Sequence, residues 1–229
     1  TDIDVDGSGR MYVSSWKNGN FAYTGPDVGF VAQITPIDFT PKPFPQLDRL
    51  DEKQLVGLLS SPSAVYRQHS QLEILRRHSA EIRKRDGKPV QTTVSEGEVI
   101  INNHGPADVA VVELAVLALD SAAPLYGRVA AIYTLNQLAG ESARELLLKF
   151  SEDADVREFA LRALTDRKAG LDKLPLEPFI VALKDKNPRV RGQALICLGR
   201  IGRSEAGESI LPLTTRATYQ PKPTAEPLY

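Results

Sequence analysis

Polar and apolar positions alternate in the first 47 residues of the chain. Aspartates and aliphatic residues alternate over residues 2–6, and residues 11–16 and 29–35 are rich in β-branched and aromatic side chains. This period of two predicts short strands separated by glycine-rich turns and loops. Because two or three such strands cannot bury a core alone, we expect them to pack on the first pair of helices, with Trp16 or Phe30 partly buried there.

From residue 48 onward, apolar residues recur every three or four positions, which is typical of helices. Ser61-Pro62 and Asn187-Pro188 have the composition of a helix start, and Gly202 that of a helix stop. The pattern predicts a helix that begins near residue 50 and another that begins at Ser61-Pro62. Further helices are predicted over residues 107–119, 125–138, 141–150, 156–164, 178–183, 190–201 and 204–213.

The chain therefore divides into three predicted parts. Residues 1–47 form a β segment, residues 48–215 form helical repeats, and residues 216–229 form an extended, proline-rich exit tail. Residues 84–106 form an insertion in the helical part. Alternating residues on both sides of Glu96-Gly97 predict that this insertion is a small β-hairpin or a mobile loop that projects from the helices.

A short motif recurs in the helical part. The pattern Arg-x-x-Ala-x-x-x-Leu begins at Arg128, Arg157 and Arg191, and a weaker copy with Ser and Ile begins at Arg67. The three strong copies are about 30 residues apart, which is the length of one helix pair. A small residue lets a neighbouring helix approach, and the apolar residue four positions later lies on the same face. This register predicts an α-solenoid of about four helical hairpins, preceded by a short β segment.

These copies resemble HEAT-like repeats, and residues 187–202 show the resemblance best. The resemblance implies a structural arginine ladder, in which Arg128, Arg157 and Arg191 pair with acidic residues of the turns between helices. The corresponding turn before Arg67 contains only serines, so no ladder position is assigned to it. An anion-binding stripe is the alternative, but one arginine per repeat in fixed register is what stacking requires. Candidate acidic partners are Asp153, Asp155 and Asp185.

Both halves of the chain resemble one larger family. Residues 4–16 and 23–32 resemble the last propeller blade of planctomycete-type membrane-bound dehydrogenase and haem-binding proteins. Residues 59–69 and 123–135 resemble their helical segment, and residues 219–229 its exit. The resemblance implies a parent that combines a sugar-dehydrogenase-like β-propeller, HEAT-like repeats and a haem domain with a Cys-x-x-Cys-His motif. It also implies a periplasmic or extracytoplasmic location, and we expect this chain to be an internal piece of that parent.

The composition of the chain argues against several kinds of binding site. The 28 Lys+Arg and 29 Asp+Glu give a formal net charge of −1, and the pI near 6.3 does not favour nucleic-acid binding. The single cysteine, Cys197, cannot form a Cys-x-x-Cys clamp for haem or metal, and its apolar helix predicts a buried, structural thiol. Phosphate-binding loops and nucleophile elbows are absent from the sequence. The longest apolar stretch is too short to span a bilayer, so we expect no direct membrane insertion.

Metal-binding patterns are weak. Asp2, Asp4 and Asp6 resemble the start of an EF-hand loop, but Val13 stands where that loop requires a bidentate glutamate. We therefore interpret these aspartates as part of a strand and its turn. The spacing of the three histidines is not typical of a metal site either. They are His69, His78 and His104.

We expect no catalytic, cofactor-binding or metal-binding residue in this chain, and no haem, flavin or nicotinamide. The leading hypothesis is a non-catalytic scaffold or protein-interaction segment. Its partners would be another protein or neighbouring domains of the parent chain, without nucleic acid. The alternative is the C-terminal part of a propeller-type sugar or alcohol dehydrogenase whose activity needs the remaining blades. In that case Trp16, Tyr23 and residues 17–27 would line the mouth of a substrate site.

Overall fold

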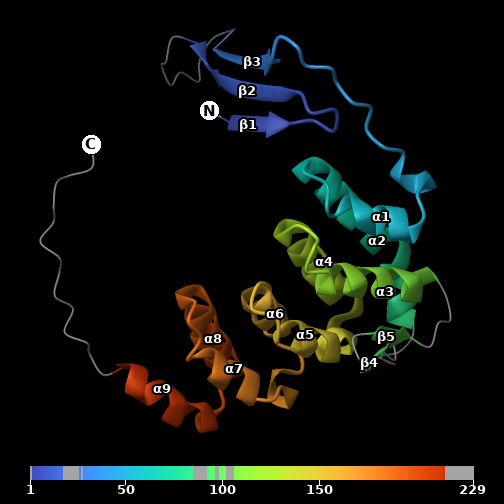
Figure 1. Ribbon diagram of the computed structural model, residues 1–229. Coiled ribbons are helices and arrows are strands. Elements are labelled where there is room, and N and C mark those ends of the chain that lie inside the picture. Colours follow the sequence, from blue (N-terminus) through green and yellow to red (C-terminus); the bar gives the residue numbers. More distant parts are fainter. Residues whose placement is uncertain are drawn as a thin grey trace, which may run out of the picture. The chain divides into compact units, whose positions relative to one another are not determined.

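A computed structural model shows a mainly α-helical chain preceded by a three-stranded sheet (Figure 1), as the hydrophobic pattern predicts. Contacts divide the chain into two compact units, residues 1–146 and 147–229. The predicted exit tail, residues 216–229, lies outside the described residues. The structure describes residues 2–17, 26, 28–84, 92–95, 98–101 and 106–214.

The N-terminal sheet consists of β1 (Asp2–Val5), β2 (Met11–Trp16) and β3 (Gly29–Ile34), in that order. Both pairings are antiparallel. The turn between β1 and β2 forms because the carboxylate of Asp6 accepts the backbone N–H of Ser8, at 2.9 Å, in the manner of an Asx turn. The strands predicted from the alternating pattern are therefore confirmed.

The two faces of this sheet differ in polarity. Residues directly opposite each other in register point to the same face, so Ile3, Val13 and Ala32 share one side. That side, which we name the apolar sheet face, holds no charged residue. Five of its side chains are between 38 % and 61 % exposed, so the face is largely open to solvent. The apolar sheet face consists of Ile3, Val5, Met11, Val13, Ser15, Phe30, Ala32 and Ile34.

A phenylalanine of the extended segment after β3 links the sheet to the helices. The ring of Phe44 lies so close to the turn at Gly7 that it leaves no room for a Cβ atom there. On its other side the ring meets Tyr66 and His69 edge-on, with centroid distances of 5.4 and 5.2 Å. Phe44 therefore makes a contact with the helices. Of the two residues predicted to lie there, Phe30 is 42 % exposed and Trp16 is half-buried.

Two helix pairs follow in the first unit. They are α1 (Glu52–Leu58) with α2 (Ala64–Lys84), and α3 (Pro106–Leu119) with α4 (Leu125–Ala139). The first pair packs on the second, α1 against α3 and α2 against α4. This arrangement is the stacking of repeats that the register predicts.

The predicted start of α2 at Ser61-Pro62 is wrong by two residues, because the helix begins at Ala64. Ser63 has the N-cap position, because its hydroxyl accepts the backbone N–H of Tyr66 at 3.4 Å. The Ser61 hydroxyl accepts the N–H of Ser63 instead, at 3.2 Å, and forms a turn of its own. The Ser-Pro pair thus belongs to the turn between α1 and α2.

The insertion between α2 and α3 contains the predicted hairpin. Strands β4 (Thr92–Ser95) and β5 (Glu98–Ile101) pair antiparallel, with Ser95 opposite Glu98. The turn residues Glu96 and Gly97 lie outside the described residues, as do residues 85–91 and 102–105.

The second unit begins within α5 (Arg144–Phe150) and continues with α6 (Arg157–Leu164), α7 (Glu177–Ala182), α8 (Pro188–Ile201) and α9 (Gly207–Thr214). Helices α6 and α7 both pack on α8.

Both ends of α8 match the sequence prediction. The Asn187 side chain accepts the backbone N–H of Arg189 at 3.0 Å, and Pro188 has the first helical position. Gly202 ends the helix with φ +67°, a conformation that favours glycine.

The repeat register determines the core in both units. The fourth residue of each motif copy is completely buried, and the apolar residue four positions later is at most 9 % exposed. The small residues therefore lie where neighbouring helices approach most closely. The four pairs are Ser70 and Ile74, Ala131 and Leu135, Ala160 and Leu164, and Ala194 and Leu198.

Candidate functional site

Three of the repeat arginines hold the turn that precedes their own helix. In each case the guanidinium donates to two backbone carbonyls, six and five residues earlier in the chain, over 2.7 to 3.1 Å. We name this arrangement the turn clamp. The carbonyls belong to Ser61 and Pro62 for Arg67, to Ser151 and Glu152 for Arg157, and to Asp185 and Lys186 for Arg191.

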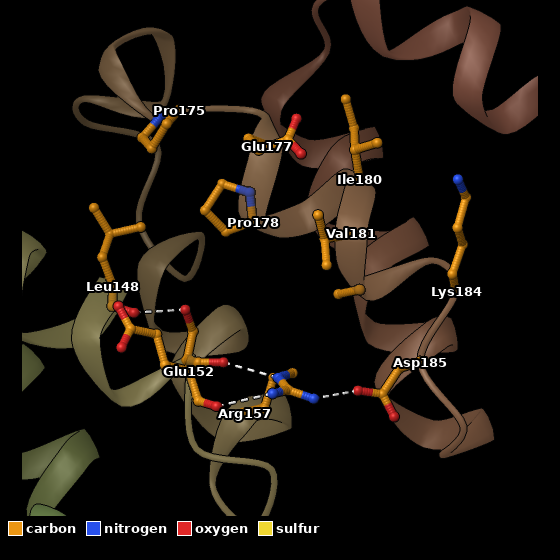
Figure 2. A pocket seen from close by; sticks show the side chains of 12 residues that line it. Leu148, Glu152, Arg157, Pro175, Glu177, Pro178, Ile180, Val181, Lys184 and Asp185 are labelled. Atoms are coloured by element: carbon orange, nitrogen blue, oxygen red, sulfur yellow. Dashed lines mark hydrogen bonds and ion pairs between the residues drawn. The ribbon is translucent and has the colours of Figure 1, made fainter.

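Arg157 also reaches the next helix pair. Its Nη1 donates to the carboxylate of Asp185, which lies in the turn between α7 and α8 (Figure 2). The same carboxylate accepts the N–H of Asn187 at 2.8 Å, and the Asp185 carbonyl accepts from Arg191. The hydrogen bond from Asn187 and then that from Arg157 hold the pKa of Asp185 below its usual value, so this residue is charged at neutral pH.

Two other predicted ladder residues, Arg128 and Asp153, also bind backbone groups. Arg128 is buried, and its Nε donates to the carbonyl of Ala118 at 3.0 Å, at the end of the preceding helix. Asp153 accepts the N–H of Asp155 at 2.9 Å, which shapes their common turn. Arg67, to which no ladder position was assigned, makes the same turn clamp as Arg157. The sequence does not reveal this clamp, because its acceptors are backbone carbonyls and not acidic side chains.

A groove with a volume of about 880 Å³ lies beside α7 in the second unit (Figure 2). We name it the α7 groove. Its first wall is α7 with the turn that follows, and its second wall is the end of α5 with the turn before α6. Arg157 lies between these walls, held by its turn carbonyls and by Asp185. The lining residues include Leu148, Glu152, Pro178, Ile180, Val181 and Lys184.

The α7 wall has an ordered pattern of charge. Glu177, Ile180 and Val181 belong to α7, and Lys184 lies in the turn that follows the helix. Ile180, Val181 and Lys184 follow Glu177 by three, four and seven residues, and all four line the groove. Val181 is 59 % exposed. The charged side chains at the two ends are exposed, and within the described part of the chain neither makes an ion pair. This wall is therefore a short apolar stripe with a negative end and a positive end.

The thiol of Cys197 is completely buried, as its apolar helix predicts. It donates to the carbonyl of Leu161 at 3.3 Å and accepts from the hydroxyl of Thr165 at 3.1 Å. Burial raises the pKa of this thiol, so the neutral form dominates. Cys197 thus joins α8 to α6 through its hydrogen bond to Leu161.

The N-terminal aspartates form a strand and turn, as interpreted from the sequence. Asp6 accepts from the hydroxyl of Ser8 at 2.7 Å and from the N–H of Arg10 at 2.9 Å. The Ser8 hydroxyl, followed by the backbone N–H of Arg10, lowers the pKa of Asp6 to about 2. Asp2 and Asp4 each accept the backbone N–H of the residue that follows.

The two described histidines, His69 and His78, have different partners. His78 is buried, with its Nε2 at 3.2 Å from a carboxylate oxygen of Glu52, whereas His69 packs on Phe44. His104 lies outside the described residues. Among the residues that the structure describes, no group of three or more His, Cys, Asp or Glu side chains is placed to hold a metal ion.

The model of the HEAT repeat family matches residues 143–221. A search of curated proteins gave no match to this chain. The matched segment includes the turn clamps of Arg157 and Arg191 and the α7 groove. The predicted class, a mainly α, HEAT-like solenoid after a short β segment, is therefore confirmed, and the match supports a repeat-type scaffold or interaction segment. None of the described helices has the length and apolar character needed to cross a bilayer.

Proposed function

We propose that this chain is a non-catalytic scaffold and protein-interaction segment of a larger, dehydrogenase-like haem protein. The main support for the proposal is the apolar sheet face, which is exposed and which precedes the helix pairs along the chain. A three-stranded sheet needs a hydrophobic face packed on another layer to be stable. In this chain the helices contact the sheet through Phe44, and the apolar face is left for another element.

The position of that further layer follows from the edge strand. The backbone N–H groups of Ile3 and Val5 donate to the carboxylates of the preceding aspartates, at 2.9 and 2.7 Å. These donors of β1 are thus already used, which disfavours an additional strand along that edge. A covering layer is therefore expected over the apolar sheet face, where each square ångström of buried apolar surface contributes about 25 cal/mol.

The sequence resembles propeller-containing dehydrogenase and haem-binding proteins, and this resemblance supports β structure as the covering layer. In such a parent, neighbouring β structure would cover the sheet, and the helix pairs would connect it to a haem domain. The same resemblance supports a periplasmic or extracytoplasmic location. The absence of haem, flavin and nicotinamide from this chain stays a prediction.

The test begins with the intact mass and reading frame of the natural protein. We expect β-rich sequence before this segment and a Cys-x-x-Cys-His motif after it. In that full protein, Met11→Lys on the apolar sheet face should lower the thermal midpoint. Val31→Lys is the matched control, because Val31 is exposed on the opposite face. A natural protein without these flanking parts, or equal effects of the two variants, would refute the proposal.

One observation favours the alternative, a role in dehydrogenase activity. A hollow of about 570 Å³ lies against β2 and β3, with Trp16, Ser14 and Phe30 in its lining. Tyr23, the other residue predicted to line a substrate mouth, lies outside the described residues. Dye-linked oxidation of sugars and alcohols by the full protein, with and without Trp16→Ala, separates the two functions. Loss of turnover with unchanged stability would assign Trp16 to a substrate site and overturn the scaffold proposal.

A further inference from the structure

The charged ends of the α7 wall are arranged for a partner of a particular kind. Glu177, at the start of α7, and Lys184, in the turn after it, are seven residues apart and mark the two ends of the α7 wall. Ile180 and Val181 lie midway between them, and Val181 is 59 % exposed. A helix that packs on this wall should therefore bring an apolar centre, a positive end opposite Glu177 and a negative end opposite Lys184.

A second copy of the α7 wall, in the opposite orientation, has the apolar centre and the two charged ends that such a partner needs. If two α7 walls lie antiparallel about a two-fold axis that passes between Ile180 and Val181, the first position of one wall, on α7, faces the last position of the other, in the turn after α7. Glu177 of each copy then faces Lys184 of its partner, and the apolar centres meet on the axis. We propose that two copies of this chain associate through α7 in this antiparallel, two-fold arrangement. Such an interface is self-complementary, as two-fold symmetry requires.

The α7 groove supplies the surface around this contact. Its lining beside α7, which includes Leu148 and Pro178, adds apolar surface next to the contact. Arg157 does not compete for the partner's carboxylates, because its guanidinium is already bound by two carbonyls and Asp185. Glu177 and Lys184 are thus the charges that orient the second copy.

The contact is short, so we expect weak association, with a Kd in the micromolar range or above. Analytical ultracentrifugation over a wide concentration range should show the mass rise from 25.1 kDa towards twice that value. Because both ion pairs are exposed at the edge of the contact, added salt should weaken the association.

Charge reversal tests the arrangement. In Glu177→Lys or Lys184→Glu alone, like charges face each other at both ends, so each variant should weaken self-association on the order of tenfold. The double variant Glu177→Lys/Lys184→Glu restores opposite charges and should return the affinity to within a few-fold of the wild type. Lys186→Glu, a reversal at an exposed lysine outside the stripe, is the matched control and should have little effect.

Mixing the two single variants gives the sharpest outcome. Each variant alone has like charges on its wall, but a pair made of one Glu177→Lys and one Lys184→Glu chain has opposite charges at both ends. The mixture should therefore dimerise where neither variant does alone. A wild type that stays monomeric at every concentration would overturn the proposal, as would dimers that are indifferent to these reversals or a double variant that stays as weak as the singles. Circular dichroism checks that every variant remains folded.

Discussion

Replacement of Arg157 by methionine tests whether the repeat arginines stabilise the stack. The substitution removes the guanidinium but keeps an unbranched apolar stem. It leaves three acceptors without their donor: the carbonyls of Ser151 and Glu152, and the carboxylate of Asp185. These acceptors belong to two consecutive helix pairs, so the variant changes a turn and a contact between repeats at once.

The expected cost follows from the burial of each acceptor. Ser151 is 8 % exposed, so its carbonyl loses a partner that water cannot easily replace, at about 1–3 kcal/mol. Glu152 is exposed, and its carbonyl can be rehydrated at little cost. The Asp185 side chain is 8 % exposed but keeps its bond from Asn187, which limits that loss to about 1 kcal/mol. Together these give about 2–4 kcal/mol, or a shift of the urea midpoint by about 1 M or more.

Urea unfolding followed by circular dichroism measures this cost. Arg191→Met is the matched control, because it removes a turn clamp on an exposed arginine and should cost about 1 kcal/mol or less. A double-mutant cycle with Asp185→Asn isolates the contact between repeats, expected at about 1 kcal/mol. The folded pKa of Asp185 lies below its usual 3.8, so this coupling is present above pH 3.8 and lost as the pH falls further. If Arg157→Met costs less than about 0.5 kcal/mol, the turn clamp does not stabilise the stack, and the anion-binding alternative is favoured.

Three further changes test other parts of the structure. Ala160→Leu overfills a completely buried position and should destabilise the protein by about 1–3 kcal/mol. Its control, Ala169→Leu, lies in an exposed turn and should be nearly neutral. Equal thermal midpoints of the two variants would show that the predicted register is wrong. Phe44→Ala removes the ring between the sheet and α2, so limited proteolysis should cleave the segment after β3 faster, and an unchanged rate would show that this ring does not hold the sheet. Hydrogen bonds from Arg76 and then Arg77 lower the pKa of Glu73 to about 2 from 4.5, so its contribution to stability is full above pH 4.5 and is lost as the pH falls towards 2. Urea midpoints measured against pH should fall less steeply in this range for Glu73→Gln, and parallel profiles would contradict that assignment.

The helical part could be predicted closely because its signal is repeated. The Arg-x-x-small-x-x-x-apolar register identified the buried positions Ala131, Ala160 and Ala194, and it did so without any homologous sequence. The helix that begins at Pro188 also ended where its C-terminal glycine predicted. Local capping chemistry and repeated periodicity agree in these segments, and such agreement makes a sequence prediction reliable.

Contacts between parts that are far apart in sequence could not be predicted in this way. Phe44 lies in a proline-rich extended segment whose pattern carries no period, so nothing in the sequence pointed to its packing between Gly7 and α2. The turn clamp of Arg67 was missed because backbone carbonyls are present at every position and give no signal in a sequence. The α7 groove forms because the end of α5 lies beside α7, and the repeat register does not predict that these two segments are neighbours.

The turn clamps also determine how these turns can change. A backbone carbonyl accepts the same hydrogen bond whatever side chain it belongs to, and the chain uses Ser-Pro, Ser-Glu and Asp-Lys pairs at the three equivalent places. Turn sequences should therefore be exchangeable between repeats, apart from Asp185, whose carboxylate has a second role. Deletion of a single residue between the turn and its arginine is different, because it changes the spacing of five and six residues that both hydrogen bonds require. For engineering and for evolution alike, the length of these turns is constrained and their composition is largely free.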